Sequence, residues 1–183
     1  MILSIDVGIK NLAYIVYDGV NIIEWSVVEL CDESENATKV NMIEIGIGLH
    51  KALEHITNEV DTIIIENQIG HNAIRMKYIQ GMITYHYISQ GKENIIYWNP
   101  INKLKKYNQK EKKTYTQRKK DSVTITRLLI SEYFNYRLEY FNSHKKKDDL
   151  ADCFLQMIDY LDKEKKLGDH FFENSLALYK NIN

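Results

Sequence analysis

Apolar residues follow two spacings along the chain, one typical of strands and one typical of helices. Short segments rich in β-branched and aromatic residues predict strands. The expected strands span residues 1–6, 12–17, 21–30, 62–66 and 95–98. Asp18-Gly19 is typical of a hairpin turn, so the first three strands are expected to be consecutive and antiparallel. Residues 62–66 form a continuous apolar run before a final acid, which is typical of a strand buried on both faces.

Apolar residues at three- and four-residue spacing predict helices. The expected helices span residues 42–60, 73–89, 122–136 and 149–161. Asp121 or Ser122 is expected to cap the third of them, and residues 163–183 are expected to form a mobile tail or a short terminal helix. The order of elements predicts an α/β fold with one mixed five-stranded sheet and helices on both faces. This order is that of the ribonuclease-H-like fold, although other α/β folds share parts of it.

Composition limits the class of protein. The chain has 183 residues, of which 44% are hydrophobic and 27% charged, so general disorder is excluded. Two cysteines, Cys31 and Cys153, are too few for a disulfide scaffold or a zinc knuckle, which favours an intracellular, reducing compartment. No apolar run approaches the roughly 18 residues of a membrane span. An acid at position 6 argues against a signal peptide.

Charge is unevenly placed along a chain whose net charge is −1. Residues 103–120 contain nine basic residues and only one acid, Glu111, so the remainder of the chain is acidic. This separation is typical of a protein with one face for a polyanion and another for cations, although a solvated lysine-rich loop would show the same pattern. The candidate nucleic-acid contacts are Lys103, Lys105, Lys106, Arg118, Lys119, Lys120 and Lys146.

Four carboxylates stand at the ends of predicted elements. Asp6 ends the first strand and Glu66 ends the buried strand, so the two emerge at one edge of the sheet if these strands are neighbours. Asp149 and Asp152 are spaced i, i+3 and share one face of a helix start. Each acid has a simpler explanation as a turn residue, a lysine partner or a helix cap. Asp148 is geometrically possible in place of Asp149, which we favour.

Clustered carboxylates repel one another unless hard cations lie among them. Ligands that are all oxygen favour Mg²⁺ or Mn²⁺ over zinc. Two such ions roughly 3.5–4 Å apart can activate a water and stabilise the leaving oxygen of a phosphodiester. The acids therefore predict a two-metal phosphodiesterase site, with the lysine-rich segment contacting the neighbouring phosphates.

Three segments together resemble the RuvC-like Holliday junction resolvases, and most closely their poxvirus-type and mitochondrial branch. The segments are residues 4–11 (SIDVGIKN), 63–68 (IIIENQ) and 146–152 (KKDDLAD). The resemblance spans about residues 1–161 and implies a RuvC-like nuclease domain at 1–162. It also implies a homodimeric endonuclease that uses Mg²⁺ or Mn²⁺ to cut four-way DNA junctions symmetrically, leaving 5′-phosphate and 3′-hydroxyl ends.

The resemblance assigns roles to particular residues. Asp6, Glu66, Asp149 and Asp152 would be the catalytic, metal-binding carboxylates. Family members also use a basic residue upstream of the last two acids, for which Lys119 is the first choice and Lys120 the second. A site of viral replication in the host cytoplasm or an organelle matrix would suit such an enzyme.

Other functions remain open at this point. A ribonuclease-H-fold nuclease for other branched or hybrid nucleic acids would keep all four acids, whereas a non-catalytic junction-binding module would need only the basic segment. A sugar-kinase- or actin-like ATPase shares the first turn, but 8 glycines argue against its phosphate loops. The apolar stripe of the 73–90 helix could form a dimer seam or pack on its own sheet.

Overall fold

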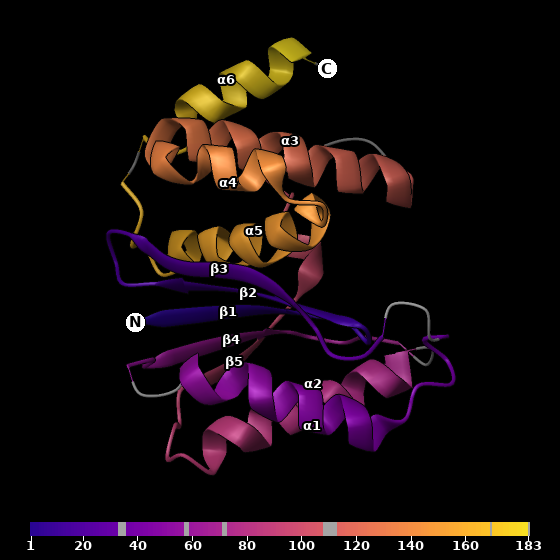
Figure 1. Cartoon of the computed structure of the whole chain (residues 1–183). Helices are drawn as coiled ribbons and strands as arrows, with labels where there is room; N and C mark the ends of the chain where they lie inside the picture. The colour runs from indigo at the N-terminus through magenta and orange to yellow at the C-terminus, as the bar shows by residue number, and fades with distance from the viewer. Residues whose placement is uncertain (33–35, 57–58, 71–72, 108–112, 169, 183) are drawn as a thin grey trace.

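A computed structural model describes residues 1–32, 36–56, 59–70, 73–107, 113–168 and 170–182 (Figure 1). Lys110, Glu111 and Lys112 of the basic segment lie outside the described residues. One five-stranded sheet has the order β3-β2-β1-β4-β5. Its strands are β1 (Ile2–Val7), β2 (Asn11–Tyr17), β3 (Ile22–Glu29), β4 (Thr62–Glu66) and β5 (Ile95–Trp98). β1, β2 and β3 are antiparallel, whereas β4 and β5 run parallel to β1, so the predicted mixed sheet is confirmed.

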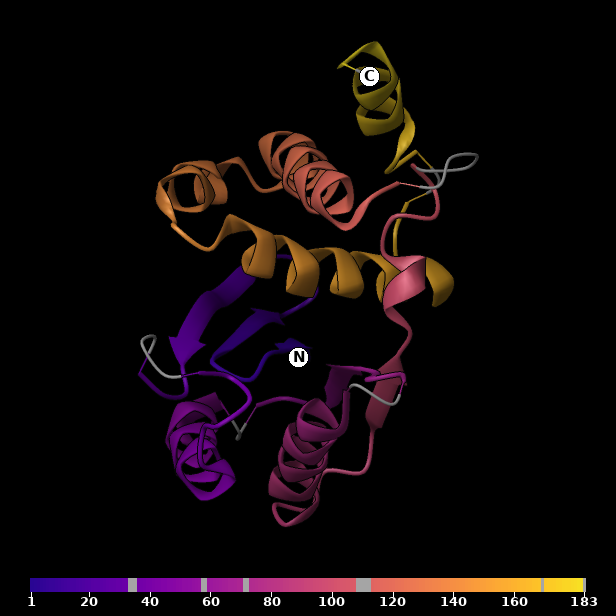
Figure 2. The ribbon, with the colours of Figure 1, turned by 90° about the vertical axis from the view of Figure 1, so that its right-hand side faces the viewer.

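Helices cover both faces of this sheet, as predicted (Figures 1 and 2). On one face lie α1 (Met42–Leu53) and α2 (Ile74–Ile88). On the other face α5 (Lys147–Lys163) packs directly on the strands, and α3 (Tyr115–Tyr133) packs on α5. Shorter elements are α4 (Leu138–Ser143), α6 (Glu173–Ile182) and the 3₁₀ turns η1 (Glu54–Ile56), η3 (Pro100–Asn102) and η4 (Asn135–Arg137). The terminal helix α6 contacts α3.

Alternation along the strands divides the core into two clusters. Leu3, Ile5 and Val7 of β1 face the cluster beneath α1 and α2. Ile64 of β4 instead belongs to the cluster around α5. Because successive strand residues point to opposite faces, Ser4, Asp6 and the acid that ends β4 all face α5. The hydrophobic pattern therefore decides which face receives the acids.

α5 is buried on two sides, because it lies between the sheet and α3. Leu150, Phe154 and Ile158 are buried, as the predicted stripe requires, but so are Leu155 and Met157 away from it. A helix with apolar residues on most of its circumference belongs to the interior of a fold. The ionisable groups on its first turns are therefore held in a partly dehydrated environment.

The structure corrects the predicted start of the third helix. α3 begins at Tyr115, and Thr114 caps it by accepting from the Gln117 amide. Asp121 is not a cap: it is buried inside the helix, where Lys113 and Gln117 donate to its carboxylate. The first turns of α3 are mostly exposed and basic, so they carry no apolar periodicity that would have marked them as helical.

The structure also settles where the first helix ends and what the last residues form. α1 ends at Leu53, and a separate 3₁₀ turn follows it, so the helix predicted to residue 60 is too long. The last residues form a helix, α6, rather than a tail. In the described part of the chain, no helix is both long enough and apolar enough to cross a membrane.

Candidate functional site

Asp6 and Glu66 lie side by side at one end of the central strands. β1 and β4 are paired in parallel, with Ile5 opposite Ile65, so the next step in the register brings the two acids together. Both side chains are mostly buried, with 16% and 15% of their surface exposed. The two acids were expected to share one edge if these strands are neighbours, and the strand order meets that condition.

α5 brings a third acid to this pair. Asp152 is close enough to Asp6, Glu66 and Lys103 for mutual electrostatic effects, and it lines the same cleft as Glu66. Asp149 lies one turn earlier, where its charged neighbours include Asp148, Lys119 and Asp152. The structure therefore groups Asp6, Glu66 and Asp152, with Asp149 beside the group on its α5 side.

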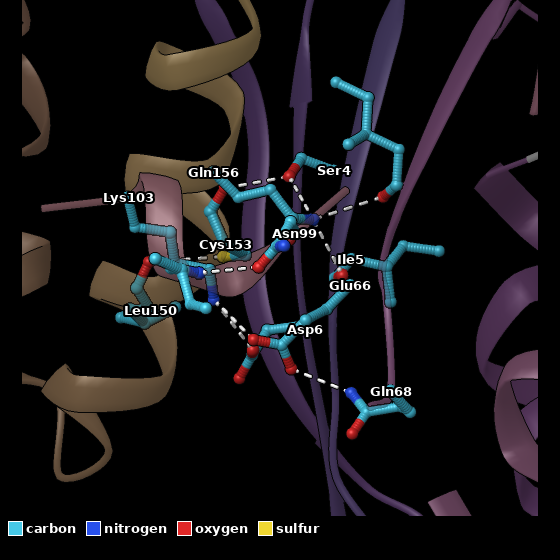
Figure 3. Close-up of polar contacts among 12 residues, drawn as sticks. Ser4, Ile5, Asp6, Glu66, Gln68, Asn99, Lys103, Leu150, Cys153 and Gln156 are labelled. Carbon is cyan, nitrogen blue, oxygen red and sulfur yellow. Dashed lines mark hydrogen bonds and ion pairs between the residues drawn. The ribbon is translucent and has the colours of Figure 1, made fainter. Parts of the chain in front are cut away.

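A lysine occupies the centre of the acidic group. The Lys103 Nζ lies 2.9 Å from Glu66 Oε1 and 3.3 Å from Asp6 Oδ1 (Figure 3). Only 6% of this side chain is exposed. Lys103 directly follows η3, the 3₁₀ turn that begins at Pro100 after the end of β5. The turn folds the start of the basic segment inward, so this lysine serves as a counter-ion inside the site.

The charges of this group are strongly coupled. Burial lowers the pKa of Lys103, but the carboxylates of Asp6, Asp152 and Glu66 outweigh burial and raise it overall. Burial raises the pKa of Asp6 well above its usual range, and the charges of Glu66 and Asp152 act in the same direction. For Glu66, burial is outweighed by the charge and hydrogen bond of Lys103, so its pKa is lowered.

Two acids of α5, Asp149 and Asp152, have raised pKa values. Burial is the main cause of the raised pKa of Asp152, and the charge of Glu66 adds to it. Burial likewise raises the pKa of Asp149, with the neighbouring charge of Asp148 in support. A bound cation would favour the ionised forms of these carboxyl groups and so lower their pKa values.

Lys119 pairs with Asp148 at the start of α5. Burial raises the pKa of Asp148, but the hydrogen bond and charge of Lys119 outweigh it, so the pKa is lowered. These same contacts, together with a hydrogen bond to Tyr115, raise the Lys119 pKa against the effect of burial. Asp148 thus has a lysine partner of its own, which is consistent with the choice of Asp149 as the candidate metal ligand.

A cleft of about 470 Å³ opens beside the acidic group. Its charged lining residues are Glu66, Lys103, Lys105, Lys113, Arg118, Lys119 and Asp152. A second surface hollow adjoins it, where Lys119 and Lys120 of α3 face Lys145 and Lys147 at the start of α5. Glu66 and Asp152 therefore line a cleft whose other charged residues are all basic.

The predicted nucleic-acid contacts fall into different surroundings. Lys105, Arg118 and Lys120 are exposed, and Lys146 is partly exposed. Lys106 forms an ion pair with Asp162 and lies over the Phe172 ring. Lys103 alone is buried among acids, a position that favours a role within the acidic site over contact with a distant phosphate.

The donor set of the site suits a hard divalent cation. Carboxylate oxygens are the ligands that Mg²⁺ and Mn²⁺ prefer, and the Lys103 ammonium already places a positive charge between Asp6 and Glu66. Within the described ranges, no three acidic, histidine or cysteine side chains are gathered tightly enough to hold an ion. A cation bound by Asp6 and Glu66 would compete with the Lys103 ammonium for the same carboxylate oxygens.

Sequence reasoning placed Lys103 on the DNA-binding surface and so missed its position inside the site. It also gave no separate role to Gln68, whose side-chain amide donates to Glu66 Oε2 at 2.8 Å (Figure 3). Gln80 of α2 accepts from the Gln68 backbone amide at 2.9 Å and holds this loop. The Glu-x-Gln spacing was visible in the sequence, but no local pattern marks a lysine after a proline as buried.

Comparison with known proteins agrees with this architecture. The family model described as Poxvirus A22 protein matches residues 1–164. A Holliday junction resolvase of fowlpox virus (strain NVSL) is 30% identical over 167 residues, which cover 88% of this chain and 92% of that protein. An uncharacterized protein 97L of invertebrate iridescent virus 3 is 22% identical over 206 residues, with 85% of this chain and 98% of that one covered.

Solved structures share the fold. The crystal structure of the fowlpox virus Holliday junction resolvase matches with a TM-score of 0.64 at 22% identity, covering 88% of this chain and 98% of that one. RuvC of T. thermophilus in complex with its Holliday junction substrate matches with a TM-score of 0.55 at 12% identity, covering 89% and 95%. The solved structures show that the fold is shared with RuvC, and the family match over residues 1–164 shows that the chain belongs to the poxvirus A22 protein family.

Proposed function

We propose that this protein is a Holliday junction resolvase, a divalent-metal-dependent endonuclease that cuts four-way DNA junctions. One observation carries the proposal: Asp6 and Glu66 contact a buried lysine, and Asp152 of a third distant segment lies within electrostatic reach of them beside a basic cleft. The fowlpox virus relative, a Holliday junction resolvase, supports this choice of substrate. Because that relative is viral, we also favour a site of viral replication in the host cytoplasm over an organelle matrix as the location of this protein.

Asp6, Glu66, Asp149 and Asp152 would hold the metal, as Mg²⁺ or Mn²⁺, and we propose two ions per site. When bound, such ions supply activation of the attacking water and stabilisation of the negative charge on the leaving oxygen. The contribution of the chain is to keep the acids in place and to exclude bulk water from one side of them. Mostly buried side chains at Asp6 and Glu66 satisfy that requirement.

Two lysines act at different positions in this proposal. Lys103 neutralises the acids before metal binds, because its ammonium lies against Asp6 and Glu66. Lys119 borders both basic hollows and is held by Asp148, so it is placed to neutralise charge on the scissile phosphate. A fixed positive group at that point stabilises developing charge without reorganisation during the reaction. Exposed Arg118 and Lys120 would contact flanking phosphates.

We further propose that the protein acts as a homodimer, which would place two identical sites on a two-fold substrate and make paired, symmetric cuts. The products would carry 5′-phosphate and 3′-hydroxyl ends. The predicted stripe of α2 divides in the structure: Ile79 and Ile83 are buried on the sheet, whereas Ile74 and Tyr78 are exposed. Tyr85 continues the exposed side, so α2 offers an outer apolar face as the candidate dimer seam.

The test is incubation with a synthetic four-way junction and a matched linear duplex, in Mg²⁺, Mn²⁺ or EDTA. We expect the wild type to cut the junction only when metal is present. Asp149→Asn and Asp152→Asn should bind the junction without cutting it. Glu164→Gln, which changes an exposed acid at the end of α5, should cut at the wild-type rate. Faster cutting of an RNA–DNA hybrid or a flap would indicate a ribonuclease-H-fold enzyme of different specificity. Junction binding in EDTA with no cutting in either metal would indicate a non-catalytic binding module.

A further inference from the structure

A glutamine side chain lies in the dry interface between α5 and the sheet. Gln156 is fully buried, and its side-chain amide reaches across to the central strands (Figure 3). Its Nε2 lies 3.0 Å from the carbonyl oxygen of Ile5, 3.4 Å from that of Ile64 and 3.1 Å from Ser4 Oγ. One side chain therefore joins α5 to both strands that carry the acids of the site.

The sheet also holds the backbone of α5. Ser4 Oγ donates to the carbonyl oxygen of Cys153 at 2.9 Å, and the indole Nε1 of Trp25 donates to that of Leu150 at 3.1 Å. Ser4, Trp25 and Cys153 are all buried. Dispersion contacts depend little on direction, whereas hydrogen bonds have a defined geometry and so add a directional constraint on the position of the helix.

Each bond involves a residue that lies one or two positions from an acid. Ile5 precedes Asp6, Ile64 stands two residues before Glu66, and Cys153 follows Asp152. On α5, Leu150 and Gln156 lie on either side of Asp152, and Leu150 directly follows Asp149. The polar contacts are thus placed where a small shift of α5 would change the distances between acids on the helix and acids on the strands.

Burial alone would favour an apolar residue at position 156. Moving an amide out of water is costly unless its hydrogen bonds are replaced, and in the described part of the chain Gln156 Oε1 has no hydrogen-bond partner. Leucine has similar volume and no such cost. A glutamine at this position therefore fixes the geometry between α5 and the strands at some cost in folding stability, which is the role documented for some buried polar groups.

We propose that Gln156 and Ser4 are positioning residues that set the spacing between the acids of α5 and those of β1 and β4, and thereby set the affinity of the site for divalent metal. This inference rests on the proposed function, because it assumes that these acids bind metal. Loss of a partner that orients metal ligands typically weakens metal binding about 10–100-fold. The same loss is expected here without loss of folding.

The test compares Gln156→Leu and Ser4→Ala with Thr126→Val. Thr126 is a matched control because it is fully buried on α3 with a hydroxyl that has no described partner. Mn²⁺ affinity is measured by calorimetry without DNA, and the unfolding midpoint is measured in EDTA. We expect Gln156→Leu and Ser4→Ala to bind Mn²⁺ about 10–100-fold more weakly, with the Gln156→Leu midpoint unchanged or raised and Thr126→Val at wild-type affinity.

A double variant adds a sharper criterion. Gln156 and Ser4 touch, so their effects on Mn²⁺ affinity are expected to be non-additive, whereas those of Gln156 and Thr126 should add. Wild-type Mn²⁺ affinity in both Gln156→Leu and Ser4→Ala would overturn the inference. If the wild type binds Mn²⁺ but cuts no junction, the proposed function fails while the positioning role is still decided by calorimetry. If the wild type binds no Mn²⁺, both fail.

Discussion

Replacing Lys103 with methionine removes the positive charge at the centre of the acidic group. Methionine has a similar length and suits a buried position, so the packing of the stem is largely retained. The carboxylates of Asp6 and Glu66 would then face each other without a counter-ion in the metal-free protein. The expected result is a protein that is less stable in EDTA and more dependent on metal.

The distances set the size of this effect. At an effective dielectric constant of about 20, a unit charge pair at 2.9 Å or 3.3 Å attracts by about 5–6 kcal/mol. The cost of burying the ammonium offsets much of the combined attraction. Removing one member of a buried ion pair typically costs about 3–5 kcal/mol, because a charge is left uncompensated. We expect the lower end, since the raised pKa of Asp6 lets that acid relieve repulsion by holding a proton.

Urea unfolding at neutral pH measures the prediction, in EDTA and in saturating Mn²⁺. Lys103→Met should lose about 3 kcal/mol of unfolding free energy in EDTA, recover most of it in Mn²⁺, and bind Mn²⁺ more tightly than the wild type. Lys105→Met is the control, because Lys105 is exposed and two residues away. Equal stability of wild type and Lys103→Met in EDTA would refute the reasoning, as would equal stabilisation of both by Mn²⁺.

Three further predictions follow from the same geometry. Burial raises the pKa of Asp6, so its contribution to the stability of the metal-free protein should be lost as pH rises from about 3.9 through the raised value. Urea titrations of wild type and Asp6→Asn in EDTA measure this difference, and parallel pH profiles would contradict it. Lys119→Ala should lower the single-turnover cutting rate about 10²–10³-fold with little change in junction affinity. Arg118→Ala should weaken junction binding and reduce the salt dependence of the binding constant by about one in slope. The reverse pattern would exchange the roles of the two residues. Gly81→Leu should dissociate the proposed dimer, as measured by sedimentation, without unfolding the protein. Gly81 is exposed on α2, and an added Cβ there meets nothing within 4 Å. A dimer that persists in this variant would exclude this face of α2 as the seam.

Residue patterns alone determined much of this protein. The isoleucine run of β4 predicted a strand buried on both faces, and the acids that end β1 and β4 were expected to share an edge if those strands are neighbours. The i, i+3 spacing placed Asp149 and Asp152 on one side of α5. These inferences succeeded because strand and helix periods are local, so a few consecutive residues carry the whole signal.

Only the tertiary structure decided how the acids are neutralised and held. Lys103 and Lys105 stand in the same basic segment, yet one is buried between two acids and the other is exposed, because the turn after Pro100 directs the chain inward at one position. Gln156 is likewise polar on a buried helix face, and its partners lie 92 to 152 residues away in the chain. Contacts at such separations leave no periodic trace in the sequence, since they depend on where the sheet brings distant segments together.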